Sequence, residues 1–160
     1  MTSTEAIKPV LTPETLLHHW QGHRRLTRRT IEAFPEDQLV SYSLGGMRPF
    51  HQLVIEMLSM ARPIAEGVAT GVWPAWAEIE LPSTKAALLA RWDEDTAALD
   101  RIVPTIPLAR LTTLDKAFGI WEGTGLDTIL YAIDNEIHHR AQAYVYLRTL
   151  GLTPPDFYQR

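Results

Sequence analysis

Apolar residues recur at helical spacing in four separate stretches of the chain. Near the N-terminus, leucine, tryptophan, isoleucine and phenylalanine positions repeat at intervals of three, four and seven residues, as on the buried face of an amphipathic helix. The same pattern along the chain predicts four helices: Pro13 to Phe34, Phe50 to roughly Ala69, Thr84 to Val103, and Leu126 to Leu150. The second is apolar on nearly every side, which indicates packing against neighbours on more than one face.

Capping residues and helix breakers support these boundaries. Thr12, whose side chain can cap free amides, stands before Pro13, whose φ suits the first helical turn. Gly151 and the two prolines that follow it end the last helix. Glycines and prolines also mark the connections between helices. The longest, from Pro104 to Gly125, is predicted to be a crossover that contains a short hairpin or a helical turn.

Four amphipathic helices are most economically arranged as a bundle, because each must bury its apolar face against the others. We therefore predict an all-α fold, a four-helix bundle in up-down-down-up order with a long crossover before the last helix. A chain of 160 residues, of which 46% are hydrophobic and 21% charged, can enclose one continuous core. A single domain over residues 1–160 is expected.

Composition and charge limit the partners, the cellular compartment and the metal ligands that can be expected for this protein. The formal net charge of −4 offers no overall attraction to phosphate backbones or anionic lipids, so neither nucleic acid nor a membrane is an expected partner. No apolar run reaches the length of a bilayer span, and the N-terminus lacks the pattern of a secretory signal or transit peptide, which predicts a cytoplasmic protein. The sequence contains no cysteine, so any metal would be bound by His, carboxylate or amide side chains.

The first predicted helix carries a band of basic residues. The band lies in one stretch of the helix with three histidines: Arg24, Arg25, Arg28 and Arg29, beside His18, His19 and His23. The acidic balance of the chain disfavours nucleic-acid binding, and Trp20 and Ile31 indicate that the helix also has a core face. We therefore interpret the band as a solvated or dimer-contact face.

The last predicted helix contains the residues best suited to a metal-binding site. Asn135 and His139 are four residues apart, so their side chains point in the same direction and could grip one ion together. The same spacing also suits a histidine that hydrogen-bonds within a helix interface. Nearby, Arg140 is expected to pair with Glu136, while Gln142 could orient a metal-bound water or cross-link two helices.

Two segments near the C-terminus resemble the closing helix and tail of the DinB family. They are residues 135–142, Asn-Glu-Ile-His-His-Arg-Ala-Gln, and residues 151–158, Gly-Leu-Thr-Pro-Pro-Asp-Phe-Tyr. The similarity extends back through 34–39, 46–50 and 70–73 in the family's order. The family is related to YfiT-type and mycothiol-dependent maleylpyruvate isomerase-type bundles. The resemblance implies a four-helix bundle, a homodimer, and one divalent metal bound by one histidine of the second helix and two of the last.

Placed on that pattern, the sequence has Glu56, Asn135 and His139 at the three metal-ligand positions. The resemblance thus implies a zinc, nickel or manganese site with a carboxylate, a neutral amide and one histidine, a set that binds less tightly than three histidines and favours harder ions. In the alternative, Glu56 lies on a solvated edge of its helix. His51 lies about 140° around the helix from Glu56 and is the substitute ligand if the placement differs.

Two functions are consistent with these residues. In the first, a divalent ion activates water or a thiol, or polarises a carbonyl, which resembles family members that are thiol-dependent transferases or isomerases and others proposed as metal-dependent hydrolases. In the second, the substituted site has lost its metal, and the dimeric bundle binds a small molecule or serves only structure. Trp73, Trp76 and Trp121 lie in predicted connections and could cover the open end of a pocket near the ion. The sequence indicates no catalytic residue and no substrate.

Overall fold

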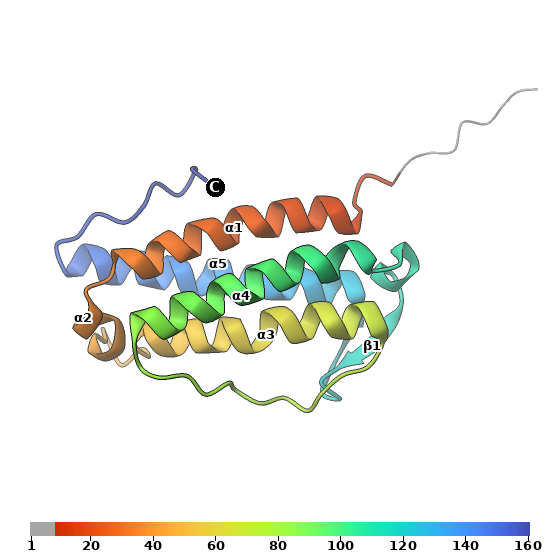
Figure 1. Cartoon of the computed structure of the whole chain (residues 1–160), viewed down its shortest axis with the longest axis horizontal. Helices are drawn as coiled ribbons and strands as arrows, with labels where there is room; N and C mark the ends of the chain where they lie inside the picture. The colour runs from red at the N-terminus through yellow and green to blue at the C-terminus, as the bar shows by residue number, and fades with distance from the viewer. Residues whose placement is uncertain (1–8) are drawn as a thin grey trace, which may run out of the picture.

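Four long helices lie side by side along one axis in the computed structural model, which describes residues 9–160 (Figure 1). They are α1 (Pro13–Ala33), α3 (Phe50–Thr70), α4 (Lys85–Ile102) and α5 (Gly125–Thr149). Each boundary lies within one residue of the prediction. The periodicity does not predict α2 (Glu36–Ser41), because six residues are too few to show a helical repeat.

Both predicted helix caps are present. The side-chain oxygen of Thr12 accepts a hydrogen bond from the backbone N–H of Thr15 at 3.3 Å. In turn, the backbone N–H of Thr12 donates to the Thr15 hydroxyl at 2.8 Å. Gly151 follows α5 with a φ of 77°, a left-handed conformation that glycine adopts without strain. Within residues 9–160, none of the helices combines the length and apolar character needed to cross a membrane.

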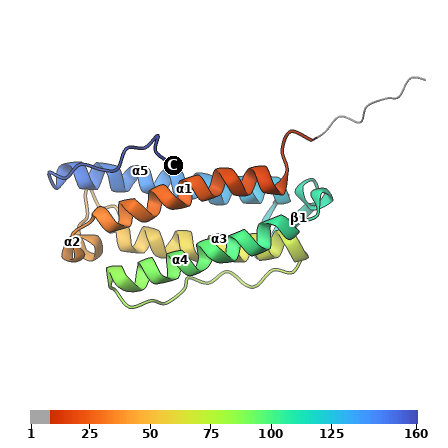
Figure 2. The same ribbon diagram turned by 45° about the horizontal axis from the view of Figure 1, so that its top comes forward.

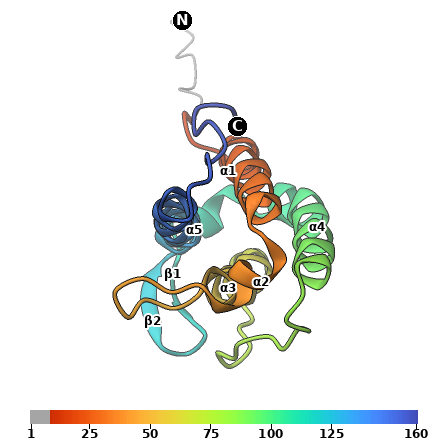
Figure 3. The same cartoon turned by 90° about the vertical axis from the view of Figure 1, so that its left-hand side faces the viewer.

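The helices pack in a ring around a shared core. In the end view of Figure 3, α1 lies between α4 and α5, and α3 lies opposite α1 between the same two helices. Figures 1 and 2 show α1 and α5 running in one direction and α3 and α4 in the other. This confirms the predicted four-helix bundle in up-down-down-up order. The two-sided packing of α3 explains its apolar residues on nearly every side.

The connections confirm the predicted hairpin and helical turns before α5, but the segment that crosses the length of the bundle lies before α4 and not before α5. The chain before α5 is long, as expected, but it stays at one end of the bundle as two 3-10 turns, η1 (Val103–Thr105) and η2 (Leu108–Leu111), and an antiparallel hairpin, β1 (Leu114–Ala117) with β2 (Trp121–Thr124). The segment that runs the length of the bundle is 71–84, between α3 and α4 (Figure 1). These two helices are parallel, so the chain must return to the starting end before α4 begins.

A layer of polar side chains lies in the core between α5 and α1. The Glu136 carboxylate is 2% exposed and accepts hydrogen bonds from Thr27 Oγ1 at 2.6 Å and Trp20 Nε1 at 3.3 Å. Arg140 Nη1 lies 3.7 Å from Glu136 Oε1, which confirms the predicted pair, and donates to Thr27 Oγ1 at 2.9 Å. Burial raises the pKa of Glu136, and the guanidinium of Arg24 opposes that rise. These contacts fix the rotation of α5 against α1.

The interpretation of the basic band as a solvated or dimer-contact face is wrong for Arg24. This residue is fully buried: its guanidinium stacks on the ring of Trp92 at 3.5 Å and donates to the Trp92 carbonyl at 2.9 Å. Arg24 follows Trp20 by four residues and therefore shares its core stripe. His23 is buried as well, whereas Arg28 forms a surface ion pair with α4 at 2.6 Å.

Replacement of Glu136 by alanine should destabilise the fold by about 3–5 kcal/mol, because the buried guanidinium of Arg140 would lose its carboxylate. The free energy of unfolding is measured by urea denaturation. Asp134→Ala removes an exposed carboxylate from the same helix and should change stability by less than about 0.5 kcal/mol. A loss for Glu136→Ala as small as that of this control would contradict the role of the polar layer.

Candidate functional site

Glu56 on α3 and two residues of α5, Asn135 and His139, converge in the groove between these helices. Glu56 Oε1 lies 3.0 Å from His139 Nε2 and 3.0 Å from Asn135 Nδ2, and the two nitrogens are 3.2 Å apart. The residues that the family pattern assigns to ligand positions are therefore neighbours in space. The side chain of Glu56 is only 16% exposed, so it does not lie on a solvated helix edge.

The polar layer of the core explains why α5 presents these side chains to α3. Glu136 and Arg140 form one stripe of α5, which contacts α1. Asn135 and His139 each precede one of them by a single position, about 100° around the helix. They form the adjacent stripe, which contacts α3. A single rotation of α5 thus places both pairs.

The second oxygen of Glu56 is held by an arginine from the loop before α3. Arg48 Nη2 lies 2.5 Å from Glu56 Oε2, and the Arg48 carbonyl accepts a hydrogen bond from the Tyr146 hydroxyl at 3.0 Å. Burial raises the pKa of Glu56, but hydrogen bonds from His139, Asn135 and Arg48 together lower it to about 2. Glu56 is therefore ionised throughout the physiological pH range.

The ring of His139 is oriented by Gln142, one turn further along α5. His139 Nδ1 lies 3.0 Å from Gln142 Oε1, so with the amide in this orientation Nδ1 is the donor and carries the proton. The opposite nitrogen, Nε2, faces the Glu56 carboxylate at 3.0 Å. Two acceptors at this distance attract each other only when a cation lies between them, and that cation is either a proton or a metal ion. Gln142 thus acts within α5 and does not cross-link two helices through this contact.

The separation of the three donors fits a divalent ion. Ligands in adjacent positions of an octahedral ion with bonds of about 2.1 Å are about 3.0 Å apart, whereas tetrahedral ligands are about 3.4 Å apart. The observed separations of 3.0, 3.0 and 3.2 Å match the octahedral case. Among the described residues, Asn135 Oδ1 is buried without a hydrogen-bond partner, and a half-turn of the amide would aim this oxygen at Glu56 and His139.

The charge of the site is less favourable to a metal than its shape. Glu56 contributes one negative charge, and Arg48 already lies against that carboxylate. Over residues 9–160, no group of three or more His, Cys, Asp or Glu side chains is placed to hold a metal ion, so Asn135 is needed to complete the set. One anionic and two neutral donors favour a modest affinity.

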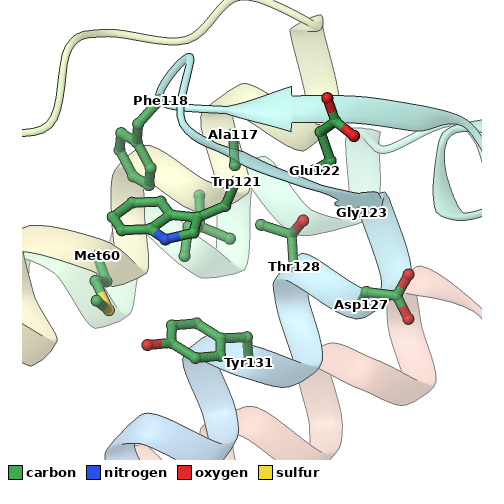
Figure 4. Close-up of a pocket in the computed structure, with 10 residues that line it drawn as sticks. Met60, Ala117, Phe118, Trp121, Glu122, Gly123, Asp127, Thr128 and Tyr131 are labelled. Carbon is green, nitrogen blue, oxygen red and sulfur yellow. The ribbon is translucent and has the colours of Figure 1, made fainter.

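A cavity of about 290 Å³ lies between α3, α5 and the β1–β2 hairpin. Figure 4 shows the residues that line it. Its wall on α3 includes Met60, which follows Glu56 by four residues. Its wall on α5 includes Tyr131, which precedes Asn135 by four residues. The β1–β2 hairpin supplies the remaining wall. The cavity is therefore one helical turn from the polar site on both helices.

The three tryptophans of the connections gather at this cavity. Trp121 lines it and contacts Trp76 and Phe118 edge to face, with ring centroids 5.9 and 5.8 Å apart. Trp73 also packs on Phe118, at 5.5 Å, and covers Gly67, where a Cβ atom would lie 2.3 Å from the indole. Trp121 therefore faces the cavity, while Trp73 and Trp76 support its aromatic wall.

His51, the substitute ligand, lies away from the polar site. It is buried on another face of α3, and its Nε2 atom has no hydrogen-bond partner within the part of the chain that the structure describes. It lines a separate hollow with Glu78 and Glu80. The five-residue separation from Glu56 turns the two side chains apart, as the helical period predicts.

Three residues of this region were not predicted from sequence: Arg48, Phe118 and Tyr131. Periodicity cannot orient the loop that contains Arg48, although the residue stands in the stretch 46–50 that resembles the family. Phe118 has a φ of 54° in the hairpin turn, where glycine or asparagine is the usual signal. Tyr131 precedes Asn135 by four residues and lies on the same face of the helix, but a tyrosine there carries no metal-ligand signal.

Replacement of Glu56 by glutamine should flatten the loss of stability in acid. A carboxyl group whose pKa falls from 4.5 to about 2 on folding stabilises the folded state above the higher value, and this contribution is lost as the pH falls between the two. The free energy of unfolding, measured by urea denaturation from pH 5 to pH 2, should fall less steeply in the variant, by on the order of 1 kcal/mol.

Glu66→Gln changes an exposed ion pair on the same helix and is the matched control. It should keep the pH dependence of the unmodified protein. If Glu56→Gln also kept it, the contacts of Glu56 would not hold its carboxylate ionised.

Comparisons with known proteins agree with the fold and extend over nearly the whole chain. The "Uncharacterized protein YjoA" of Bacillus subtilis strain 168 is 29% identical over 150 residues, which cover 91% of this chain and 95% of that protein. A solved DinB-like protein from Bacillus cereus ATCC 10987 has a TM-score of 0.74 at 18% identity, covering 91% of this chain and 97% of the other. The solved DinB-like protein YjoA from Bacillus subtilis has a TM-score of 0.73 at 23% identity, covering 91% and 98%. The model of the DinB family matches residues 2–160, and the chain therefore belongs to the DinB family.

Proposed function

We propose that this protein binds one divalent metal ion through Glu56, Asn135 and His139 and uses it in a reaction on a small organic substrate. The observation that carries the proposal is the convergence of these three donors at mutual distances of 3.0 to 3.2 Å. Manganese and nickel suit this separation better than zinc, because they accept octahedral coordination. When bound, an ion with open positions would supply a Lewis acid for a water, a thiol or a carbonyl group.

The family resemblance suggests two reaction classes for such an ion, metal-dependent hydrolysis and thiol-dependent transfer. The sequence contains no cysteine, so a transferase would take its thiol from a second substrate. Gln142 holds the His139 ring with Nε2 toward the groove, and Arg48 holds Glu56 so that Oε1 remains available. The adjacent cavity would hold the organic part of the substrate away from water.

A metal-free, non-catalytic bundle is the second candidate. The ion pair between Arg48 and Glu56 favours it, because a cation already accompanies the one carboxylate of the site. With a proton on His139 Nε2, the carboxylate is satisfied without a metal. In that case the protein, which we expect to be a homodimer, binds a small molecule in the cavity or serves only structure.

Metal analysis separates the two candidates. Protein freed of metal with EDTA is reconstituted with manganese, nickel or zinc, and the bound metal is quantified after desalting. We expect close to one ion per chain with manganese or nickel, and loss of that ion in His139→Ala. His138→Ala removes the exposed neighbouring histidine and should retain the ion. Protein that stays empty with all three metals would refute metal binding and leave the metal-free bundle.

Replacement of Asn135 by histidine should tighten metal binding by about tenfold or more, because imidazole is a better ligand than a neutral amide. Isothermal titration calorimetry with nickel measures the dissociation constant. If Asn135→His bound nickel no more tightly than the unmodified protein, residue 135 would not belong to the site.

A further inference from the structure

We infer that the cavity between α3, α5 and the β1–β2 hairpin binds a flat, uncharged organic ring. We also infer that this ring is part of the substrate of the polar site, a step that rests on the proposed function. The inference follows from the walls of the cavity, from the exposure of its aromatic side chains, and from the charges at its rim.

The walls are apolar and come from three elements. Met60 and Ile64 belong to α3, while Ala117 and Phe118 belong to the hairpin. Figure 4 shows the Trp121 indole and the Tyr131 ring on opposite sides of the open space, with Met60 at one edge. A cavity of about 290 Å³ with such walls has the size and the chemistry of a site for a small aromatic molecule.

The aromatic side chains at the mouth are exposed although they are held in place. Trp121 is 48% exposed and Tyr131 is 57% exposed. Two rings hold the indole of Trp121 edge to face, Trp76 at an interplanar angle of 79° and Phe118 at 88°. Because the indole is already fixed, a ligand that covers it loses little conformational freedom. An apolar ring gains both burial and an aromatic contact there.

The turn of the hairpin supports a binding role. Phe118 and Gly119 have φ values of 54° and 71°, both left-handed, in the three-residue loop between the paired residues Ala117 and Trp121. Glycine and asparagine are the residues favoured in this conformation. Phenylalanine is poorly suited to this position, yet its ring is buried behind Trp121. Backbone strain of this kind is characteristic of ligand sites, where the position of a side chain is maintained although the turn is strained.

Charge at the rim selects against anions. Glu122 and Asp127 border the cavity, and no Lys, Arg or His is among the described residues that line it. Hydrogen bonds from the hydroxyl and the backbone N–H of Thr124 lower the pKa of Asp127, which keeps it ionised. Both carboxylates point away from the open space in Figure 4, so neither is placed to form a direct ion pair with a cation inside. A neutral ring is the ligand that fits.

The position of the cavity defines the orientation of the ring. The next turn of α3 beyond Met60 carries Glu56, and the next turn of α5 beyond Tyr131 carries Asn135. A ring that stacks on Trp121 would direct a substituent along the groove toward these two residues. The substrate class is therefore a planar aromatic or conjugated ring that carries an oxygen- or sulfur-bearing group at one end.

Two probes of similar shape and different charge test ring binding in metal-free, ¹⁵N-labelled protein: 2-naphthalenemethanol, which is neutral, and 2-naphthoate, which is an anion. The side-chain N–H signals of the five tryptophans report binding, and Trp121→Phe identifies the signal of Trp121. We expect 2-naphthalenemethanol to shift that signal and 2-naphthoate to bind at least about fivefold more weakly, because of the rim carboxylates.

Tyr131→Ala should weaken binding of the neutral probe by about fivefold or more, and its exposed position protects the fold. Leu130→Ala changes an exposed neighbour outside the cavity and should bind like the unmodified protein. An unmoved Trp121 signal, equal binding of the two probes, or unchanged binding to Tyr131→Ala would overturn the assignment. Since no metal is present, these results do not depend on whether the polar site holds an ion.

The link to the polar site has its own test. With nickel present, 2-naphthohydroxamate adds a metal-binding group to the same ring and should bind the unmodified protein at least about tenfold more tightly than His139→Ala. Equal affinities would overturn the link and leave ring binding standing. If metal analysis finds one ion per chain while no probe reaches Trp121, the proposed metal site stands and the ring site falls.

Discussion

The buried carboxylate of Glu136 is the contact on which the arrangement of this bundle depends. It accepts hydrogen bonds from Thr27 and Trp20 of α1 and lies beside Arg140 of its own helix. Apolar contacts alone tolerate small rotations and repacking of a helix. A buried charge does not, because a rotated α5 would take the carboxylate and the guanidinium away from the hydrogen-bonding groups of α1. The rotation fixed on the α1 side therefore also decides which residues of α5 meet α3.

Charge balance decides what the groove between α3 and α5 can hold. Glu56 faces Arg48 with one oxygen and His139 with the other. The contact with Arg48 helps to keep the carboxylate ionised and leaves Oε1 directed at His139, which favours a cation between them. The same contact weakens the attraction for a divalent ion, because the carboxylate already shares its charge. A proton and a metal ion therefore compete for one position, and acid favours the proton.

Helical spacing predicts much of this structure because the bundle is built from long periodic helices. It also predicts that Asn135 and His139 share a direction, whereas Glu56 could be joined to them only through the family resemblance, since no spacing within one helix relates α3 to α5. Periodicity fails where a charged side chain enters the core. Arg24 occupies a core position because a tryptophan ring and backbone carbonyl replace its water. It also fails in the hairpin, where Phe118 stands in a turn position that its residue type does not predict.

Asn135 changes what the polar site requires in order to be stable. Three histidine nitrogens aimed at one point would present lone pairs that need an ion between them. Here the Asn135 amide donates to Glu56 Oε1 at 3.0 Å, and a proton on His139 completes the contacts, so the groove is stable without a metal. The neighbouring cavity is lined by Trp121 and Tyr131, which do not contact the position for which a proton and a metal ion compete. Affinity for a metal ion and affinity for an organic ring are thus set by different residues, and either can change without the other.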